Sequence, residues 1–207
     1  MNQLFLTSIA GDVMDDIVKY LPKKPKETNL AFIITASEVY TGDLWWLKKD
    51  KDKLIKLGFN IIEFTITGLT KSKIEEKLKN IDIIFVVGGN QLYLLDQAIK
   101  TGFDQILLQK YQDNNLIYIG SSAGSMILGK NIDISCTKEE ISSIPDLKSN
   151  GLSLIDLTIV PHFGNPKYKQ FYSQLFDKFY NTDSKLIFLR NNQYFYITDT
   201  TQKLIQV

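Results

Sequence analysis

Residues 81–102 read IDIIFVVGGNQLYLLDQAIKTG, in which an apolar run, two glycines and a longer amphipathic stretch follow one another. The first part, rich in Ile and Val, is typical of a strand that is buried on both faces. The residues after the glycines have the spacing and length of a helix. A buried strand that turns directly into a helix is the repeating unit of a parallel sheet covered by helices.

The same alternation extends in both directions along the chain. Strands are expected at residues 3–8, 29–37, 59–67, 81–89, 116–120 and 154–163. Helices are expected at residues 12–21, 42–58, 71–80, 90–102, 103–112, about 122–128 and 167–180. Strand-like pieces close the chain at 185–189, 193–197 and 202–206, and the closing segment 188–207 suggests a small antiparallel addition. The pattern predicts one α/β domain over residues 1–207, with three α/β/α layers and a mostly parallel sheet.

Composition argues against several classes of protein. The 207 residues carry 24 Lys and Arg against 23 Asp and Glu, a net charge of +1, so we expect no nucleic-acid partner. The single cysteine, Cys136, favours a reducing, cytoplasmic location. The start of the chain lacks the basic region of a secretory signal, and the apolar run IIFVV is too short to cross a membrane. With one His and one Cys, we expect no metal site and no cofactor.

Three loops follow predicted strands, at the sheet edge where α/β proteins bind their ligands: residues 88–90, 120–124 and 161–163. The middle loop, GSSAG, has the pattern G-x-S-x-G centred on Ser122. Glycines two residues to either side let the strand and the helix approach closely around an exposed serine hydroxyl. Ser121 has Ile119 and Ala123 at the corresponding positions, so it does not fit this pattern. The alternative is that the small residues only permit a tight crossing of strand and helix.

A serine nucleophile needs a base, and His162 is the only histidine of the chain. Gly88 and Gly89 would expose backbone N–H groups suited to an oxyanion hole. A phosphate-binding turn is the alternative, but the chain contains neither common nucleotide-binding glycine motif. The candidates for an acid that orients the histidine are Asp133, Glu139, Glu140, Asp146 and Asp156, and periodicity does not choose among them.

Three segments together resemble the peptidase E family, the α-aspartyl dipeptidases: FVVGGNQLYLL at 85–95, IGSSAGSMI at 119–127 and LSLIDLTIVPHF at 152–163. These are serine peptidases with a class I glutamine amidotransferase-like (flavodoxin-like) fold. The resemblance implies that Ser122 is the nucleophile and His162 the base. It implies an oxyanion hole made by Gly88, Gly89 and Ala123. Asn90, Ser121 and Tyr40 are then expected near the substrate.

The chain departs from the family pattern in two places. The family's acid is an Asp about fifteen to seventeen residues after the serine, where this chain reads TKEE, so Glu139 is expected as the acid and Glu140 is the second choice. A basic residue after the histidine is associated with aspartyl specificity in the family. Here that segment offers Lys167 and Lys169 but no arginine, and lysine supplies a point charge instead of a bidentate fork.

The expected function is therefore that of a dipeptidase E-like serine peptidase. It would hydrolyse short peptides with an acidic N-terminal residue, Asp above all, through a Ser-His-Glu triad and an acyl-enzyme. One alternative is a hydrolase of isoaspartyl or cyanophycin-like peptides or of esters. Another is a slow or inactive member that binds an acidic small molecule as a regulatory module. We expect a monomer or a homodimer. Trp45 and Trp46 are adjacent on a predicted helix, so one of them is expected at the cleft or at a dimer contact.

Overall fold

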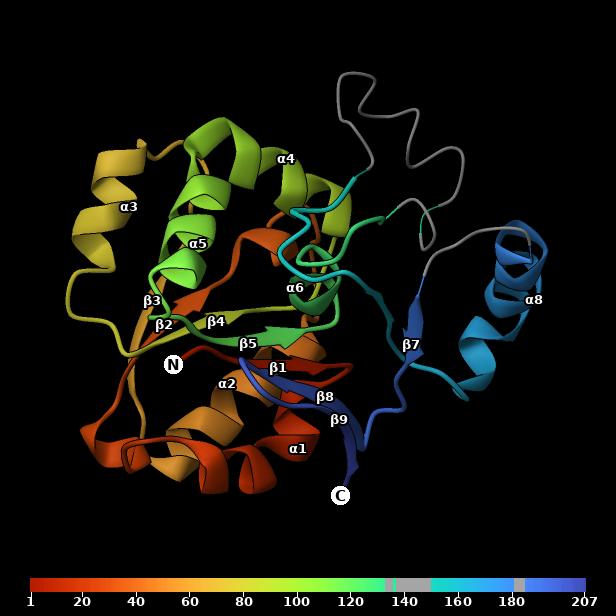
Figure 1. The fold of residues 1–207 in the computed structure, drawn as a ribbon, viewed down its shortest axis with the longest axis horizontal. Coiled ribbons are helices and arrows are strands. Elements are labelled where there is room, and N and C mark those ends of the chain that lie inside the picture. The colour runs from red at the N-terminus through yellow and green to blue at the C-terminus, as the bar shows by residue number, and fades with distance from the viewer. Residues whose placement is uncertain (133–135, 137–149, 181–184) are drawn as a thin grey trace.

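A seven-stranded sheet forms the centre of the protein in a computed structural model that describes residues 1–132, 136, 150–180 and 185–207 (Figure 1). The strands lie in the order β3-β2-β4-β5-β1-β8-β9. Five of them run parallel: β1 (Gln3–Thr7), β2 (Asn29–Ile33), β3 (Asn60–Phe64), β4 (Ile83–Val86) and β5 (Ile117–Ser121). The last two strands, β8 (Gln193–Thr198) and β9 (Gln202–Gln206) at the edge, pair in antiparallel fashion. The expected α/β class with a mostly parallel sheet is confirmed.

Helices cover both faces of this sheet, so the molecule has the three predicted layers (Figure 1). One face carries α3 (Lys71–Lys77), α4 (Gln91–Thr101) and α5 (Phe103–Gln112), and the other carries α1 (Ala10–Ile17) and α2 (Trp45–Leu57). A single turn of helix, α6 (Ala123–Met126), follows β5 directly. The core between the layers is rich in aromatic side chains, with fully buried Phe5, Phe32, Phe85, Phe103, Tyr118 and Tyr194.

A second, two-stranded sheet departs from the predicted arrangement. Strand β6 (Thr158–Val160) pairs in parallel with β7 (Leu186–Phe188), and helix α8 (Lys169–Phe179) lies beside them at one side of the molecule (Figure 1). The antiparallel addition expected in residues 188–207 is formed by β8 and β9, whereas β7 pairs in parallel with β6. The reason is that β7 belongs to a small separate core, in which Val160, Tyr172 and Leu175 are buried.

The second sheet is tied to the first near the carboxyl end of β1. The Ser8 hydroxyl accepts a hydrogen bond from the His162 N–H at 3.0 Å and donates one to the Leu189 carbonyl at 2.9 Å. One buried side chain, next to the end of β1, therefore holds the residues that follow both β6 and β7. This contact brings the loops of the second sheet to the edge where β4 and β5 also end.

Candidate active site

Ser122 stands at a strained turn between β5 and α6. Its backbone has φ 47° and ψ −106°, a combination that is costly for a residue with a side chain and that is concentrated at functional sites. The glycines around it are required by space. A Cβ on Gly120 would lie 2.6 Å from the Ser125 nitrogen, and one on Gly124 would lie 2.2 Å from the Val86 carbonyl oxygen. The crowding expected of a nucleophile elbow is therefore present.

Buried hydrogen bonds hold this turn from below. The Ser122 N–H donates to the Thr7 carbonyl at 2.9 Å, which ties the elbow to the end of β1. The Ser125 hydroxyl accepts from the Thr7 N–H at 2.8 Å and lies 2.7 Å from the Gly120 carbonyl. A fully buried polar network of this kind fixes a unique geometry because each of its members would otherwise be left unpaired.

His162 lies against the serine. Its Nε2 atom is 3.0 Å from the Ser122 hydroxyl oxygen, within the distance at which a base can take the hydroxyl proton. His162 also has a positive φ, 65°, and its N–H is fixed by Ser8 as described above. The Tyr168 ring stacks on the imidazole at a centroid distance of 5.3 Å. The imidazole is therefore oriented by its backbone and by a ring packed on its face.

The other imidazole nitrogen contacts an amide. His162 Nδ1 lies 3.0 Å from Asn191 Oδ1, in the turn between β7 and β8. An amide oxygen accepts a hydrogen bond, so Nδ1 carries the proton and Nε2 is left as the acceptor that faces Ser122. Sequence reasoning missed Asn191, because an Asn in the segment RNNQ looks like an ordinary turn residue.

The surroundings of His162 favour its neutral form. Burial lowers the pKa of His162 below its ordinary value of 6.5, the hydrogen bond with Asn191 raises it, and the Lys167 ammonium lowers it. The net direction is downward. A neutral imidazole is the form that can act as a base, so this shift extends the active form toward lower pH.

The Gly88–Gly89 loop faces the serine from the end of β4. A Cβ on Gly88 would lie 3.3 Å from the Ser122 Cβ, and one on Gly89, whose φ is 150°, would lie 2.1 Å from the Ala36 carbonyl oxygen. Within the part of the chain that the structure describes, the N–H groups of Gly88, Gly89 and Ala123 donate to no protein acceptor. Such N–H groups beside a nucleophile can receive an oxyanion.

Ser122, His162, Asn191 and the two glycines of the loop line a cleft of about 280 Å³. Its walls include Tyr40, Trp45, Trp46, Lys167 and Tyr168, so Tyr40 and Lys167 lie where the sequence analysis expected them. Lys167 is the only charged side chain among the described residues that line the cleft. The cleft is therefore largely aromatic with one cation, a combination that suits a small ligand carrying an anionic group.

Three other predicted site residues differ in where they lie. Ser121 lines the cleft, and its buried hydroxyl accepts a hydrogen bond from the Ala10 N–H at 3.2 Å. The Asn90 side chain caps α4 by accepting from the Tyr93 N–H at 2.9 Å, and it does not line the cleft. Lys169 is the exposed first residue of α8 and also lies outside the cleft lining. In the first two cases the side chain accepts a hydrogen bond from a backbone N–H group, that of Ala10 for Ser121 and that of Tyr93 for Asn90.

The acid candidates divide into two groups. Asp156 forms ion pairs with Lys130 at 2.9 Å and Lys185 at 2.7 Å, on the exposed surface, and these lysines lower the pKa of its carboxyl to about 2. It does not contact His162. The remaining candidates lie outside the described residues, namely Asp133, Glu139, Glu140 and Asp146.

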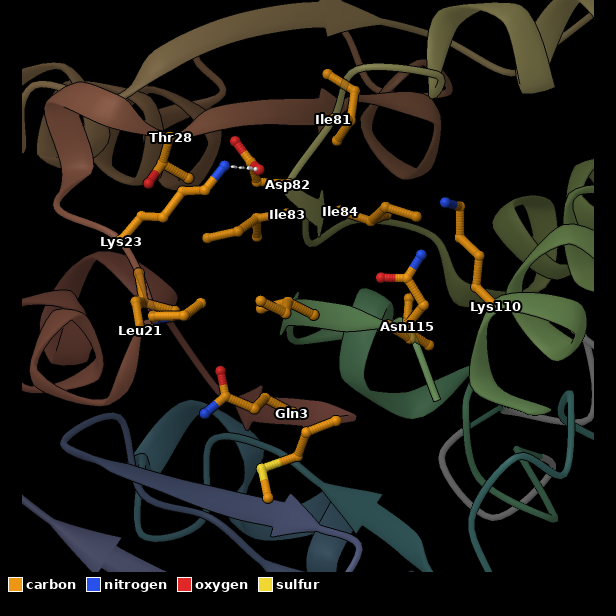
Figure 2. Close-up of a pocket in the computed structure, with 14 residues that line it drawn as sticks. Gln3, Leu21, Lys23, Thr28, Ile81, Asp82, Ile83, Ile84, Lys110 and Asn115 are labelled. Carbon is orange, nitrogen blue, oxygen red and sulfur yellow. Dashed lines mark hydrogen bonds and ion pairs between the residues drawn. The ribbon is translucent and has the colours of Figure 1, made fainter. Parts of the chain in front are cut away.

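A second hollow, of about 360 Å³, opens at the opposite, amino end of the parallel strands (Figure 2). Gln3, Ile83, Ile84 and Asn115 point toward it, and the Lys23–Asp82 ion pair, at 2.6 Å, closes one side (Figure 2). Its lining contains no serine, histidine or cysteine. Although it is the larger of the two, it has no nucleophile paired with a base, so we assign the chemistry to the cleft around Ser122.

Comparison with known proteins agrees with this geometry. The chain matches the family description "Peptidase family S51" over residues 4–205. The chain belongs to peptidase family S51. It is thus a serine-type peptidase, a hydrolase, as the resemblance to peptidase E implied.

Individual relatives support the same assignment. An uncharacterized peptidase of Pasteurella multocida is 29% identical over 203 residues, which is 98% of this chain and 96% of that protein. An uncharacterized peptidase of Listeria monocytogenes is 32% identical and covers 82% of each chain. A solved structure described as a "Putative Peptidase E Protein" from Listeria monocytogenes superposes with a TM-score of 0.88 at 27% identity, over 100% of this chain and 99% of that one.

The described residues also lack two features that would indicate particular partners. No helix there is long and apolar enough to cross a membrane. No group of three or more His, Cys, Asp or Glu side chains in that part of the chain is arranged to hold a metal ion.

Proposed function

We propose that this S51 peptidase is a dipeptidase that hydrolyses short peptides with an acidic N-terminal residue through an acyl-enzyme on Ser122. The observation that carries the proposal is the 3.0 Å contact between the Ser122 hydroxyl and His162 Nε2 at a strained elbow. A serine hydroxyl is a weak nucleophile until a neighbouring base accepts its proton, and this contact supplies the base.

The reaction follows from the groups around the serine. Ser122 Oγ attacks the peptide carbonyl carbon while its proton passes to His162 Nε2. The carbonyl oxygen becomes an oxyanion that accepts hydrogen bonds from the N–H groups of Gly89 and Ala123. The C–N bond then breaks, and the imidazolium returns its proton to the leaving amine. Water, deprotonated by His162, hydrolyses the ester on Ser122 and frees the N-terminal amino acid.

The third member of the triad is proposed to be Asn191. Its amide oxygen accepts from His162 Nδ1–H and keeps the ring in the tautomer that the reaction requires. A neutral amide stabilises the imidazolium less than a carboxylate does, and burial lowers the pKa of His162 by more than the hydrogen bond with Asn191 raises it. Glu139, which lies outside the described residues, is the competing candidate and is tested together with Asn191 below.

Selection of an acidic residue is proposed to rest on Lys167. This ammonium lies in the cleft wall, where it can attract the side-chain carboxylate of an N-terminal Asp. A relative in Drosophila melanogaster is named "Probable alpha-aspartyl dipeptidase"; it is 29% identical over 118 residues, which is 56% of this chain and 46% of that protein. That name suggests the substrate class for this chain as well.

Dipeptide kinetics test the proposal. Asp-Leu, Asn-Leu and Ala-Leu should be compared with the wild-type protein and with Ser122→Ala, Lys167→Met and Lys169→Met. We expect Asp-Leu to be preferred over its isostere Asn-Leu by up to about fivefold, because Lys167 is exposed and an exposed charge pair contributes about 0.2–1 kcal/mol. Ser122→Ala should abolish turnover, and Lys167→Met but not Lys169→Met should remove the preference. Binding of Asp-Leu without hydrolysis by the wild type would instead favour a regulatory module.

A further inference from the structure

The peptide unit between Gly88 and Gly89 is held by a side chain from another element. Trp46, the second residue of α2, donates a hydrogen bond from its indole Nε1 to the Gly88 carbonyl oxygen at 3.2 Å. Trp46 also packs against the loop, since its Cδ1 would lie 3.7 Å from a Cβ placed on Gly88. The indole thus contacts the glycine loop both through its ring and through its polar atom.

The carbonyl that Trp46 binds belongs to the same peptide as the Gly89 N–H. This peptide bond is trans, so its C=O and N–H point in opposite directions. A hydrogen bond that fixes the carbonyl toward Trp46 therefore also fixes the N–H on the other side. The Gly89 N–H donates to no acceptor within the described chain, and Gly89 lines the cleft beside Ser122.

Backbone hydrogen bonds hold the glycine loop at both ends but, among the described residues, reach neither the Val87–Gly88 nor the Gly88–Gly89 peptide. The Val87 N–H donates to the Ile33 carbonyl at 3.1 Å, and the Asn90 N–H donates to the Ala36 carbonyl at 2.8 Å. Between these two anchors, Trp46 provides the one hydrogen bond to the Gly88–Gly89 peptide from any residue that the structure describes. Glycine on both sides makes rotation of a peptide plane inexpensive. Such a rotation would turn a carbonyl oxygen toward the place where an oxyanion forms.

Trp46 is itself well placed to resist that rotation. Its ring makes edge-to-face contacts with Tyr40, at a centroid distance of 5.7 Å, and with Trp45, at 6.0 Å. One turn further along α2, the buried Asp50 carboxyl accepts a hydrogen bond from the Gly11 N–H at 2.7 Å, which anchors α2 to the start of α1. The indole is therefore held by its neighbours and by an anchored helix.

We propose that Trp46 is a positioning residue that keeps the Gly89 N–H directed into the oxyanion hole by holding the Gly88 carbonyl. The proposal rests on the function proposed above, because it requires an oxyanion at this loop. Trp46 acts through the peptide and does not touch the reacting atoms. It should therefore affect the transition state more than the binding of substrate.

Trp46→Phe tests this role, because phenylalanine keeps an aromatic ring and removes the N–H. We expect kcat for Asp-Leu to fall by about tenfold, between the few-fold effect of one neutral hydrogen bond and the 10²–10³-fold loss of an oxyanion donor. KM and the Kd of a non-cleavable reduced-amide analogue of Asp-Leu should change by no more than about threefold. The rate of Ser122 modification by a fluorophosphonate should fall in parallel with kcat, since that reaction also develops negative charge on an oxygen.

Trp45→Phe is the matched control, because it removes the adjacent indole, which makes no hydrogen bond to the described residues. For each protein, the rate of Ser122 modification by fluorophosphonate is divided by the affinity for the reduced-amide analogue. In Trp45→Phe this ratio should stay within about twofold of the wild-type ratio. If Trp46→Phe keeps the wild-type kcat and fluorophosphonate rate, the inference is wrong while the proposed function stands. The inference is also wrong if the reduced-amide affinity falls as much as kcat. A wild type that neither cleaves dipeptides nor reacts with fluorophosphonate overturns the proposed function and the inference together.

A second variant guards against loss of folding in Trp46→Phe. The chain contains only two tryptophans, so a Trp45→Phe protein produced with benzothienylalanine in place of tryptophan carries the analogue at position 46 alone. This analogue has nearly the shape of tryptophan but lacks the N–H. The roughly tenfold loss in kcat, relative to Trp45→Phe with ordinary tryptophan, should appear here as well. An unchanged kcat would contradict the inference.

Discussion

At the scale of single residues, the hydrogen-bond partner of His162 Nδ1 is the neutral amide of Asn191. An amide oxygen fixes the tautomer, as a carboxylate would, but adds no negative charge beside the imidazolium that forms during the reaction. Burial lowers the pKa of His162, so the imidazole stays neutral at lower pH and the enzyme can work there. A base with a lower pKa also accepts the serine proton less readily. The identity of this partner can be tested by substitution.

Asn191→Ala should lower kcat/KM by about 10- to 100-fold, because the imidazole loses the acceptor that orients it. Asn191→Asp should keep activity and should raise the pKa of His162, so the acidic limb of the pH profile should move upward by about one unit or more. Steady-state kinetics from pH 4.5 to pH 8.5 measure both effects. Glu139→Gln is the comparison. If this variant loses activity and Asn191→Ala does not, the third member is Glu139 and the assignment of Asn191 is wrong.

Lys167 has a second effect that can be separated from substrate selection. Its positive charge disfavours the protonated form of His162 and so lowers the pKa of that residue. Lys167→Met should raise the pKa, and the acidic limb of kcat/KM, measured with the uncharged substrate Ala-Leu, should move to higher pH. Lys169→Met, two residues away and outside the cleft, should leave the limb in place. An unmoved limb in Lys167→Met would show that this charge does not act on His162.

At the scale of elements, helix α2 connects the glycine loop to the rest of the fold, and Asp50 is its buried anchor. The side chain is 1% exposed, and one carboxylate oxygen, Oδ2, has no geometrically acceptable hydrogen-bond partner within the described chain. Burial raises the pKa of Asp50 to about 6, the Ser121 hydroxyl and the Gly11 N–H lower it, and among nearby charges Asp12 raises it while Lys49 lowers it. The folded protein therefore has an Asp50 carboxyl that changes charge near pH 6 instead of near pH 4.

This shift predicts how stability depends on pH. The folded state holds the Asp50 proton more tightly than the unfolded chain, whose carboxyl has the ordinary pKa of 3.8. The free energy of unfolding should therefore fall between about pH 4 and pH 6, by roughly 3 kcal/mol for a shift of this size, and stay level above that range. Urea unfolding of Asp50→Asn and of the wild type at pH 4.5 and pH 7.5 measures this effect. The variant should gain stability relative to the wild type as pH rises. A difference that does not change with pH would contradict the assignment.

Sequence patterns predict some elements better than others, for physical reasons. Four of the five parallel strands, β1, β2, β4 and β5, are buried, so each is a largely apolar run and is easily recognised, whereas β3 at the sheet edge is mostly exposed. The elbow was also recognisable, because only glycine fits where the strand and the helix approach within van der Waals contact. The pairing of β6 with β7 was not predicted, since a parallel pair of three-residue strands separated by a helix has no periodicity of its own.

The same contrast holds for the site. Ser122 and His162 could be nominated from sequence because a framed serine and a single histidine offer few alternatives. Ser121 and Asn90 adjoin site residues in sequence, and their side chains accept hydrogen bonds from the backbone N–H groups of Ala10 and Tyr93, which were not predicted from the sequence. In the sequence, Asn191 is 29 residues from His162 and Trp46 is 42 residues from Gly88, so no local pattern marks these contacts.

At the scale of the whole molecule, the candidate site joins two sheets. Ser122 and the glycine loop extend from the main parallel sheet, whereas His162 and Asn191 follow strands of the small sheet beside it. Ser8 links the two by hydrogen bonds to the residues after β6 and β7. The nucleophile and its base are therefore brought together only when both sheets are folded and packed.

Mass spectrometry of the fluorophosphonate-treated protein tests the central claim most directly. The account predicts one adduct per wild-type chain, carried on Ser122 in the peptide map, and no adduct in Ser122→Ala. Labelling should be slowed by about 10²-fold or more in His162→Gln, because the general base is lost. An adduct on a different serine, or hydrolysis of Asp-Leu by Ser122→Ala at the wild-type rate, would contradict the claim that Ser122 is the nucleophile.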